Sequence, residues 1–264
     1  MRAIIFFVSV VAVTPALALP QYGSLFEARY KYRSDCSLCH VKGSEEVNAY
    51  GKAFILYGAN IEALKELEKP DIDKDGFLGR DEIQARSNPG DPLSTPKQAG
   101  KWLKKPGVSK IPTRLLRRAF PDARKFTVLE RPLTELETMN LEKKVGKENV
   151  EDIYRWPVVF VAHAGDGIVG GASYIAAVER TADNVEVNVF LLCVNPNGRI
   201  MRLDPVHVRR SAFLETQFLK QFNGAWPDDL WRLWMAPVLR EDFRKYFIWL
   251  IARESRLIDI VIPP

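Results

Sequence analysis

The chain contains 264 residues, of which 47% are hydrophobic and 27% charged, and this composition excludes a disordered or collagen-like protein. Its three cysteines are too few for a disulfide scaffold, and its only long apolar run lies at the extreme N-terminus, which excludes a multi-span membrane protein. The formal net charge of +5 allows an acidic partner, but no basic stretch interleaved with aromatic residues indicates a nucleic-acid partner.

Residues 1–18 have the pattern of a cleaved secretory signal. Arg2 precedes a short apolar core, and Ala16 and Ala18 supply the small residues three and one positions before the expected cleavage point. The apolar run is too short for a comfortable transmembrane helix, and an uncleaved N-terminal anchor is the alternative. We therefore expect a periplasmic or otherwise extracytoplasmic protein.

Residues 36–40 read CSLCH, which is the spacing of a haem c attachment site. Two thiols on one helical turn can form thioethers with the two vinyl groups of haem, and the adjacent imidazole can bind the iron. The sequence therefore predicts one covalent haem c, held by the thioethers of Cys36 and Cys39, with His40 as an axial ligand of the iron.

A disulfide and half of a zinc site are two alternative interpretations of the same pentapeptide. A zinc site would need two more soft ligands. The cysteine and histidines that remain are Cys193, His163 and His207, which lie far along the chain in expected strands. For this reason we favour haem.

Several sources are open for the second axial ligand. No Met or His occurs between Val41 and Gly100. The iron is then five-coordinate, or is bound by a Lys, a Tyr or the new N-terminal amine, or takes a ligand from a partner protein or from elsewhere in the chain. The candidates elsewhere in the chain are His163, His207, Met139 and Met201.

Residues 71–82 fit the twelve-residue calcium loop of an EF-hand at every diagnostic position. Gly76 permits the sharp turn, and a water would stand at position nine, where Gly79 has no side chain. The expected ligands are the carboxylates of Asp71, Asp73 and Asp75, the carbonyl of Phe77 and both carboxylate oxygens of Glu82. The alternative is a solvated polar turn, but three aspartates in five residues would repel one another without a cation.

Helices are expected on both sides of this loop, over residues 48–69 and 80–86, and Asn88-Pro89-Gly90 ends the second one. One loop of this kind is visible in the sequence, whereas sensor loops normally come in pairs. We therefore expect a structural calcium ion, saturated outside the cell, rather than a signalling one.

The order of these motifs resembles that of small exported bacterial cytochrome c modules with an appended calcium loop. The likeness rests on CSLCH at 36–40, NAYGKAF at 48–54, the acidic loop at 71–82 and NPGDP at 88–92. It covers about residues 30–92 and implies a small α-helical haem c and calcium-loop module over residues 19–92.

The segment 93–112 is expected to be a basic linker. It contains no acidic residue, and five lysines stand there among prolines and glycines. Such a basic strip could lie along an acidic partner, but a solvated linker is the interpretation that we favour.

Residues 113–264 are expected to form an α+β domain on an antiparallel sheet. Helices are predicted at residues 113–119, 133–146, 212–222 and 238–251. One hairpin is predicted from strands at 158–163 and 170–179, and a second from strands at 185–194 and 199–208 around an Asn-Gly turn. The apolar stripe of the last helix is expected to be core and not a cofactor site.

This half of the chain resembles the FMN-binding domain family found in flavin subunits of bacterial electron-transport complexes. The likeness rests on residues 115–123, 167–172, 189–208 and 214–222. It implies the fold of that family for residues 113–264.

The chain departs from that family at the flavin-attachment motif. Covalent members carry a Ser-Gly-Ala-Thr-like motif whose Thr hydroxyl takes the FMN phosphate, whereas the corresponding stretch here reads LWMAP at residues 233–237. No Thr follows Thr216, Ser255 lies too late, and the bulky Trp231, Trp234 and Met235 stand where small residues would be needed. We expect no covalent FMN, and we expect these bulky side chains to fill the vacated pocket or to form a contact surface.

We expect a periplasmic c-type cytochrome that carries single electrons as a subunit or docking partner of a membrane electron-transfer complex, with no nucleic-acid partner. The sequence contains no recognisable Ser/His/Asp or paired-carboxylate catalytic motif, so an electron carrier is favoured over a catalyst. One alternative is a structural or assembly subunit with a degenerate flavin domain. Another is a flavocytochrome oxidoreductase with non-covalent FMN.

Overall fold

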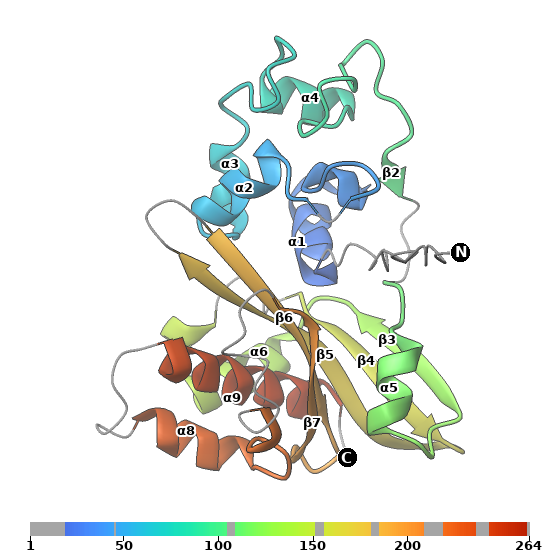
Figure 1. Cartoon of the computed structure of the whole chain (residues 1–264), viewed down its shortest axis with the longest axis vertical. Helices are drawn as coiled ribbons and strands as arrows, with labels where there is room; N and C mark the ends of the chain where they lie inside the picture. The colour runs from blue at the N-terminus through green and yellow to red at the C-terminus, as the bar shows by residue number, and fades with distance from the viewer. Residues whose placement is uncertain are drawn as a thin grey trace, which may run out of the picture.

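The computed structural model describes residues 19–44, 46–104, 109–150, 156–180, 185–208, 219–235 and 243–262. Within these ranges the chain combines helices with an antiparallel sheet, which confirms the α+β class at that level. Figure 1 shows the described residues in two lobes, a helical N-terminal lobe and a C-terminal lobe built around the sheet. None of the described helices has the length and apolar content that crossing a membrane requires. The expected signal at residues 1–18 lies outside the described residues.

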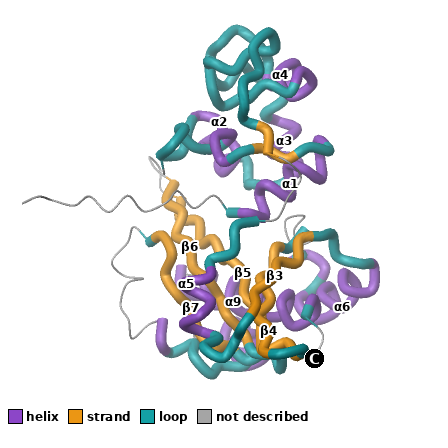
Figure 2. Tube along the Cα trace, turned by 90° about the vertical axis from the view of Figure 1, so that its right-hand side faces the viewer, coloured by secondary structure: helices purple, strands orange, loops and turns teal. Residues whose placement is uncertain are grey.

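Short helices make up most of the N-terminal lobe (Figure 2). In chain order its elements are α1 (Pro20–Tyr30), β1 (Arg33–Ser34), the 3-10 helix η1 (Cys36–Leu38), α2 (Ala49–Leu56), α3 (Ile61–Glu66), α4 (Gly79–Ala85) and β2 (Leu103–Lys104). Their shared core includes Leu25, Phe26, Leu38, Tyr50, Phe54, Leu64, Leu67 and Trp102. Because Leu38 stands between the two cysteines of the CSLCH pentapeptide, the pentapeptide is built directly onto this core.

The helix expected over residues 48–69 is broken into α2 and α3, so the prediction of a single helix is wrong. Gly58 and Ala59 have positive φ angles of 103° and 53°, which a right-handed helix cannot continue. Asn60 then begins α3, because its side chain accepts a hydrogen bond of 2.8 Å from the backbone N–H of Ala63. The helix expected at residues 80–86 is present as α4.

The described part of the segment 93–112 packs against the N-terminal lobe, which differs from the expected solvated linker. β2 pairs antiparallel with β1, with Leu103 opposite Ser34. Trp102 is 5% exposed, and its indole N–H donates a hydrogen bond of 2.8 Å to the carbonyl oxygen of Arg86. One buried tryptophan therefore anchors a stretch whose lysine-rich composition alone indicates a linker.

The sheet of the C-terminal lobe contains five described strands in the order β3-β4-β5-β6-β7. They are β3 (Lys125–Glu130), β4 (Val158–Ala164), β5 (Gly167–Arg180), β6 (Val185–Val194) and β7 (Ile200–His207). Both predicted hairpins are present, and His163 and His207 lie on strands as expected. β3 was not predicted because its side chains are exposed or half-buried, so it lacks the strong apolar alternation of a core strand.

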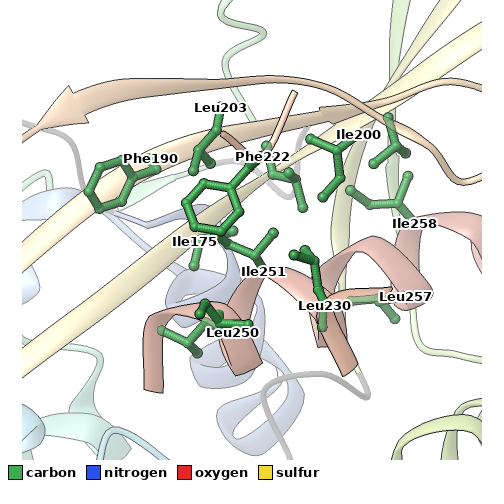
Figure 3. Packing of buried hydrophobic residues seen from close by; sticks show 14 of the residues in the cluster. Ile175, Phe190, Ile200, Leu203, Phe222, Leu230, Leu250, Ile251, Leu257 and Ile258 are labelled. Carbon is green, nitrogen blue, oxygen red and sulfur yellow. The ribbon is translucent and has the colours of Figure 1, made fainter. Parts of the chain in front are cut away.

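Helices cover both faces of this sheet. α5 (Thr113–Ala119) packs on one face, where Leu116 contacts the same apolar cluster as Leu191 and Cys193 of β6. The opposite face is covered by α6 (Glu135–Val145), which the 3-10 helix η2 (Lys147–Asn149) follows, and by α8 (Pro227–Met235) and α9 (Phe243–Val261). Figure 3 shows Ile251 and Ile258 of α9 in one cluster with Ile175 of β5, Ile200 of β7 and Phe222.

Two adjacent glycines of β5 allow close packing on both faces. A Cβ atom at Gly170 would collide with the ring of Phe120, which follows α5, and a Cβ atom at Gly171 would collide with Ile258 and Ile262 at the end of α9. Both glycines belong to the stretch 167–172 on which the resemblance to FMN-binding domains partly rests. In this chain they serve the packing of helices onto the sheet.

The C-terminal helices differ from the prediction in three ways. α9 continues to Val261, well past the predicted end at Ile251, because Leu257, Ile258 and Val261 are buried against the sheet. The predicted stripe of α9 is core at Phe247 and Leu250, but Tyr246 is 37% exposed. α8 was not predicted, because its tryptophans were interpreted only as part of the altered flavin motif. The helix predicted over residues 212–222 lies largely outside the described residues.

A buried ion pair joins the two lobes. The carboxylate of Glu130 at the end of β3 lies 2.5 Å from the guanidinium of Arg33 in β1, and both side chains are about nine-tenths buried. Ser24 of α1 donates a hydrogen bond of 2.8 Å to the same carboxylate, and Ser109 donates two of 3.0 Å from its backbone N–H and its hydroxyl. Burial alone would raise the pKa of Glu130, but these donors and the Arg33 charge outweigh it and hold the pKa below 4.5.

We expect Glu130→Ala to lower the free energy of unfolding by about 3 kcal/mol, because it leaves the Arg33 guanidinium buried without its main partner. The pKa of Glu130 is lower in the folded state than its ordinary value of 4.5. The contribution of Glu130 to the free energy of unfolding is therefore complete above pH 4.5 and is lost as the pH falls through the lowered pKa. Urea denaturation at several pH values measures both effects. The exposed Glu135→Ala is the control, and equal losses in the two variants would contradict the role of the pair.

Candidate functional site

The cysteine-containing pentapeptide forms one tight turn. Asp35 begins it by accepting a hydrogen bond of 3.0 Å from the backbone N–H of Ser37. The backbone N–H groups of Cys39 and His40 both donate to the carbonyl oxygen of Cys36, at 3.2 and 3.0 Å. Residues 36–40, which we call the attachment turn, therefore place both thiols and the imidazole on a single helical turn, as the sequence predicts.

Asn48 ties the attachment turn to α2. Its side-chain amide donates to the carbonyl oxygens of Ser37 and Leu38 at 3.1 and 3.0 Å, and its side-chain oxygen accepts from the N–H of Gly51 at 2.8 Å. A Cβ atom at Gly51 would collide with the carbonyl oxygen of Cys39, so only glycine allows α2 to lie this close to the turn.

Asn88 holds the attachment turn from the other side. It is fully buried, and its amide donates to the carbonyl oxygen and the hydroxyl of Ser37 at 3.2 and 3.4 Å. Its side-chain oxygen accepts from the N–H of Gly90 at 3.1 Å, and a Cβ atom at Gly90 would collide with the carbonyl oxygen of Leu38. Sequence reasoning quoted Asn48, Gly51, Asn88 and Gly90 within motifs but assigned none of them this role.

The thiols of the attachment turn suit neutral thioethers better than metal thiolates. Cys36 and Cys39 are both half-buried and are not joined by a disulfide. Burial, together with the neighbouring Cys36, raises the pKa of Cys39 to about 12. A zinc site would need further ligands, and within the described part of the chain no cluster of three or more metal-ligating side chains includes Cys36, Cys39 or His40. A thioether carries no charge and is therefore compatible with burial. The third cysteine, Cys193, lies away from the turn in the core of the sheet.

Tyr50 contributes an unpaired donor close to the attachment turn. Its side chain is fully buried in the core of the N-terminal lobe, and its hydroxyl has no hydrogen-bond partner among the described residues. Burial raises its pKa well above the ordinary value, and Tyr30, Cys39 and Tyr32 add to this effect, which places these groups nearby. A bound group with an acceptor at this place would satisfy the hydroxyl. The two free thiols and the adjacent imidazole of the attachment turn are the groups that a covalent haem c requires.

The four Met and His candidates for the second axial ligand all lie in the C-terminal lobe. Met139 on α6 and Met201 on β7 are 59% and 41% exposed. The Nε2 atom of His163 is 2.8 Å from the hydroxyl of Thr127 on the neighbouring strand, and His207 ends β7. The structure therefore brings His40 together with the two thiols but adds none of these four side chains to the attachment turn.

The acidic loop at residues 71–82 folds around its own backbone. Asp71 accepts hydrogen bonds from the N–H groups of Lys74 and Gly76 at 2.7 and 3.0 Å, and Asp75 accepts from that of Phe77 at 2.8 Å. Gly76 has a φ of 97°, which the sharp turn requires. Ligand oxygens of Asp71, Asp73 and Asp75 lie within 4.8 Å of one another, as the calcium prediction requires.

Glu82, at position twelve of the loop, is fully buried on α4. Its Oε2 atom and the Oδ2 atoms of Asp73 and Asp75 are buried without a hydrogen-bond partner among the described residues. Burial, together with the charges of Asp73 and Asp75, raises the pKa of Glu82 to about 8, although the hydrogen bond from Ser87 opposes this rise. Burial, with Asp75, also raises the pKa of Asp73 to about 6.

These acidic side chains fit a calcium ion. Buried carboxylate oxygens without partners are costly, and neighbouring negative charges add to the cost. A divalent cation ligated by oxygens at the three aspartates would satisfy the orphaned atoms of Asp73 and Asp75, whereas Glu82 lies outside this cluster and would have to move toward the ion. Among the described residues, the three aspartates are the one group of this kind with metal-ligating geometry, and Glu82 is coupled to all three by charge.

The stretch aligned with the flavin-attachment motif is helical where it is described. Residues 233–235 belong to α8, and the rings of Trp231 and Trp234 lie 4.9 Å apart. Trp234 also contacts Trp249 of α9 at 6.5 Å. Ser255 lies inside α9 and not beyond it as expected; it is fully buried and donates to the carbonyl oxygen of Ile251 at 2.7 Å.

Comparisons of the chain with protein-family models, with curated proteins and with solved structures give no match.

We expect calcium to raise the melting temperature of the protein, because the ion binds only the folded loop. At a concentration one hundred times the dissociation constant, the free energy of unfolding should increase by about 2.7 kcal/mol. Glu82→Ala should abolish this rise. In the presence of a chelator the same variant should be no less stable than the wild type, because it removes a buried carboxylate oxygen without a partner. Differential scanning calorimetry with calcium and with chelator measures both effects.

Glu66→Ala, an exposed substitution in the same lobe but outside the loop, is the matched control and should keep the full calcium response. A wild type whose melting temperature is unaffected by calcium, together with zero metal content, would leave the loop as a polar turn.

Proposed function

We propose that this chain is an exported c-type cytochrome that carries single electrons, as a subunit or docking partner of a membrane electron-transfer complex. The observation that carries the proposal is the attachment turn, where Cys36, Cys39 and His40 share one helical turn whose carbonyls are held by the side-chain amides of Asn48 and Asn88. Such bracing is what a site needs if its covalent cofactor is to keep a fixed orientation.

A haem bound at the attachment turn would supply one-electron chemistry at its iron. Cys36 and Cys39 would hold it through thioethers, and His40 would bind the iron from the proximal side. Asn48 and Asn88 would keep this turn from rearranging, which limits the structural change that accompanies electron transfer. Electron transfer needs no acid or base, which agrees with the absence of a legible catalytic set in the sequence.

The acidic loop would hold one structural calcium ion in this module. Asp71, Asp73, Asp75 and Glu82 would supply carboxylate oxygens, and Phe77 its carbonyl oxygen. The unpartnered buried oxygens of the loop support this assignment. The ion would stabilise α4, and Asn88, which follows this helix, contacts the attachment turn, so the ion belongs to the same functional unit.

Exposed cations on α5 support an acidic partner. Arg114, Arg117 and Arg118 are three and four residues apart and therefore share one side of the helix. Arg124 and Lys125 follow directly at the start of β3, and all five side chains are exposed and form no ion pair within the described part of the chain. A cluster of unpaired cations favours and orients the approach of an acidic protein surface.

We propose that the C-terminal lobe is an FMN-binding-like domain that has lost covalent flavin. The helical, tryptophan-rich stretch at α8 and the buried position of Ser255 support this loss, because neither offers a hydroxyl beside a glycine-rich phosphate site. The degenerate flavin domain would then serve as a scaffold for docking, which is also what the alternative of a structural subunit requires.

We expect the protein, exported in a bacterial host that matures c-type cytochromes, to have an intact mass equal to the mature chain plus one haem. Replacing both Cys36 and Cys39 with Ser should remove the covalent haem, whereas Cys193→Ser should keep it because that thiol lies in the sheet core. His40→Ala should retain haem mass but shift the absorption spectrum, since the thioethers and the iron bond are separate links. A wild-type mass equal to the bare mature chain would overturn the proposal.

We also expect acid-precipitated protein to retain no flavin fluorescence, because the C-terminal lobe offers no accessible hydroxyl for a phosphoester at the aligned position. The supernatant of the same precipitation reports any non-covalent FMN separately. Flavin fluorescence that stays with the precipitated chain would contradict the loss of covalent attachment and favour a flavocytochrome.

A further inference from the structure

The calcium loop and the attachment turn are connected through the chain that leaves α4. Arg86 has a φ of 59°, which ends the helix and turns the chain back. The backbone N–H of Ser87 donates to the carbonyl oxygen of Glu82 at 2.9 Å, and its hydroxyl lies 3.3 Å from the same oxygen and 3.4 Å from Oε1. Ser87 and Glu82 are both fully buried, so the Ser87 hydroxyl links the carboxylate of the expected last calcium ligand to the chain that follows α4.

The next residue, Asn88, carries this position to the attachment turn. Its amide reaches both oxygen atoms of Ser37, the residue that directly follows Cys36. Two residues later the carbonyl oxygen of Gly90 accepts from Asn48 at 3.0 Å, and Asn48 also donates to Leu38. The path from Glu82 to the residues between the two cysteines therefore consists of hydrogen-bonded groups, of which Glu82, Ser87 and Asn88 are fully buried and Ser37 and Asn48 half-buried.

The rest of α4 is anchored independently of the ion. The hydroxyl of Tyr32 donates to the carbonyl oxygen of Ile83 at 3.0 Å, and the indole of Trp102 donates to that of Arg86 at 2.8 Å. Removing the cation would leave the buried Oε2 of Glu82 facing other carboxylates and would favour a different placement of this side chain. Since α4 itself is held, the change would concentrate in Glu82, Ser87 and Asn88.

We propose that Asn88 is a positioning residue that couples calcium occupancy to the geometry of the attachment turn, and hence to the reduction potential of the haem. This inference rests on the proposed function. Calcium at Glu82 keeps Ser87 and Asn88 in place, and Asn88 holds Ser37 between the cysteines. Because such coupling is reciprocal, the oxidised and reduced proteins must also differ in calcium affinity.

The test uses the purified haem-loaded full chain, with calcium or with a chelator. The expected result for the wild type is a shift of the reduction potential and of the Soret circular dichroism on chelation. The ratio of calcium affinities in the two redox states must match the shift, with a tenfold ratio corresponding to about 59 mV.

The decisive variant is Asn88→Ala, which should lose most of both shifts while calcium still raises its melting temperature. A shift that comes only from the charge of the ion acting through space would survive in Asn88→Ala at full size and would overturn the inference. Asn60→Ala is the matched control, because it removes an asparagine cap of the same lobe that contacts α3 and not the attachment turn.

If Asn88→Ala fails to fold, Ser87→Ala provides the second measurement, because it removes only the hydroxyl contact to Glu82 and should reduce the shifts. Unchanged shifts in Ser87→Ala would then overturn the inference. If the wild type carries haem and binds calcium but its reduction potential and Soret circular dichroism do not respond to the chelator, only the coupling is overturned. A bare chain overturns the proposed function, and haem-loaded protein that binds no calcium overturns the calcium site.

Discussion

The backbone carbonyls of Ser37 and Leu38 are the point at which the N-terminal lobe is held together. Asn48 donates to both carbonyls and Asn88 to that of Ser37, so the chain between these asparagines is closed into a ring that contains α2, α3, the acidic loop and α4. Amides in such positions stay in place because leaving their donors unpaired is costly. The attachment turn and the acidic loop are therefore joined by one small set of hydrogen bonds.

The second constraint is the carboxylate of Glu130, which joins this lobe to the sheet. It accepts from Ser24, Arg33 and Ser109, which belong to three different segments of the chain. Removing either charge of such a pair costs more than the pair itself contributes, so the junction favours one specific arrangement of the lobes. An electron carrier with a separate docking domain needs that arrangement, because the exposed cations of α5 belong to the sheet lobe and Cys36 to the other.

The sequence was most informative where a motif is local. The spacing of Cys36, Cys39 and His40, and that of the aspartates from Asp71 to Asp75, can be read directly because each motif spans a single turn or loop. The burial of Glu82 could not be predicted, because it depends on how distant segments pack around α4. The contacts of Asn88 with Ser37 could not be predicted either, because the two residues lie far apart in the chain. For the same reason the lysine-rich stretch around Trp102 was predicted as a linker although its indole is buried.

In the sheet lobe, strong hairpin signals and apolar periodicity predicted β4 to β7, α5 and α6. β3 was not predicted because the half-buried side chains of an edge strand give a weak hydrophobic pattern. α8 was not predicted because its tryptophans stand in the stretch compared with the flavin motif, where small residues were expected. Gly170 and Gly171 look like part of a ligand motif in the sequence. In the fold they receive Phe120 and the end of α9, so a glycine pair of this kind indicates close packing as readily as a phosphate site.

The absorption spectrum of the purified protein, recorded in the oxidised and reduced states, tests the central claim most directly. We expect a Soret band that shifts on reduction together with the sharp visible bands of a reduced haem c, and no flavin absorption. A colourless protein, or a spectrum of flavin alone, would contradict an electron-carrying function based on Cys36, Cys39 and His40.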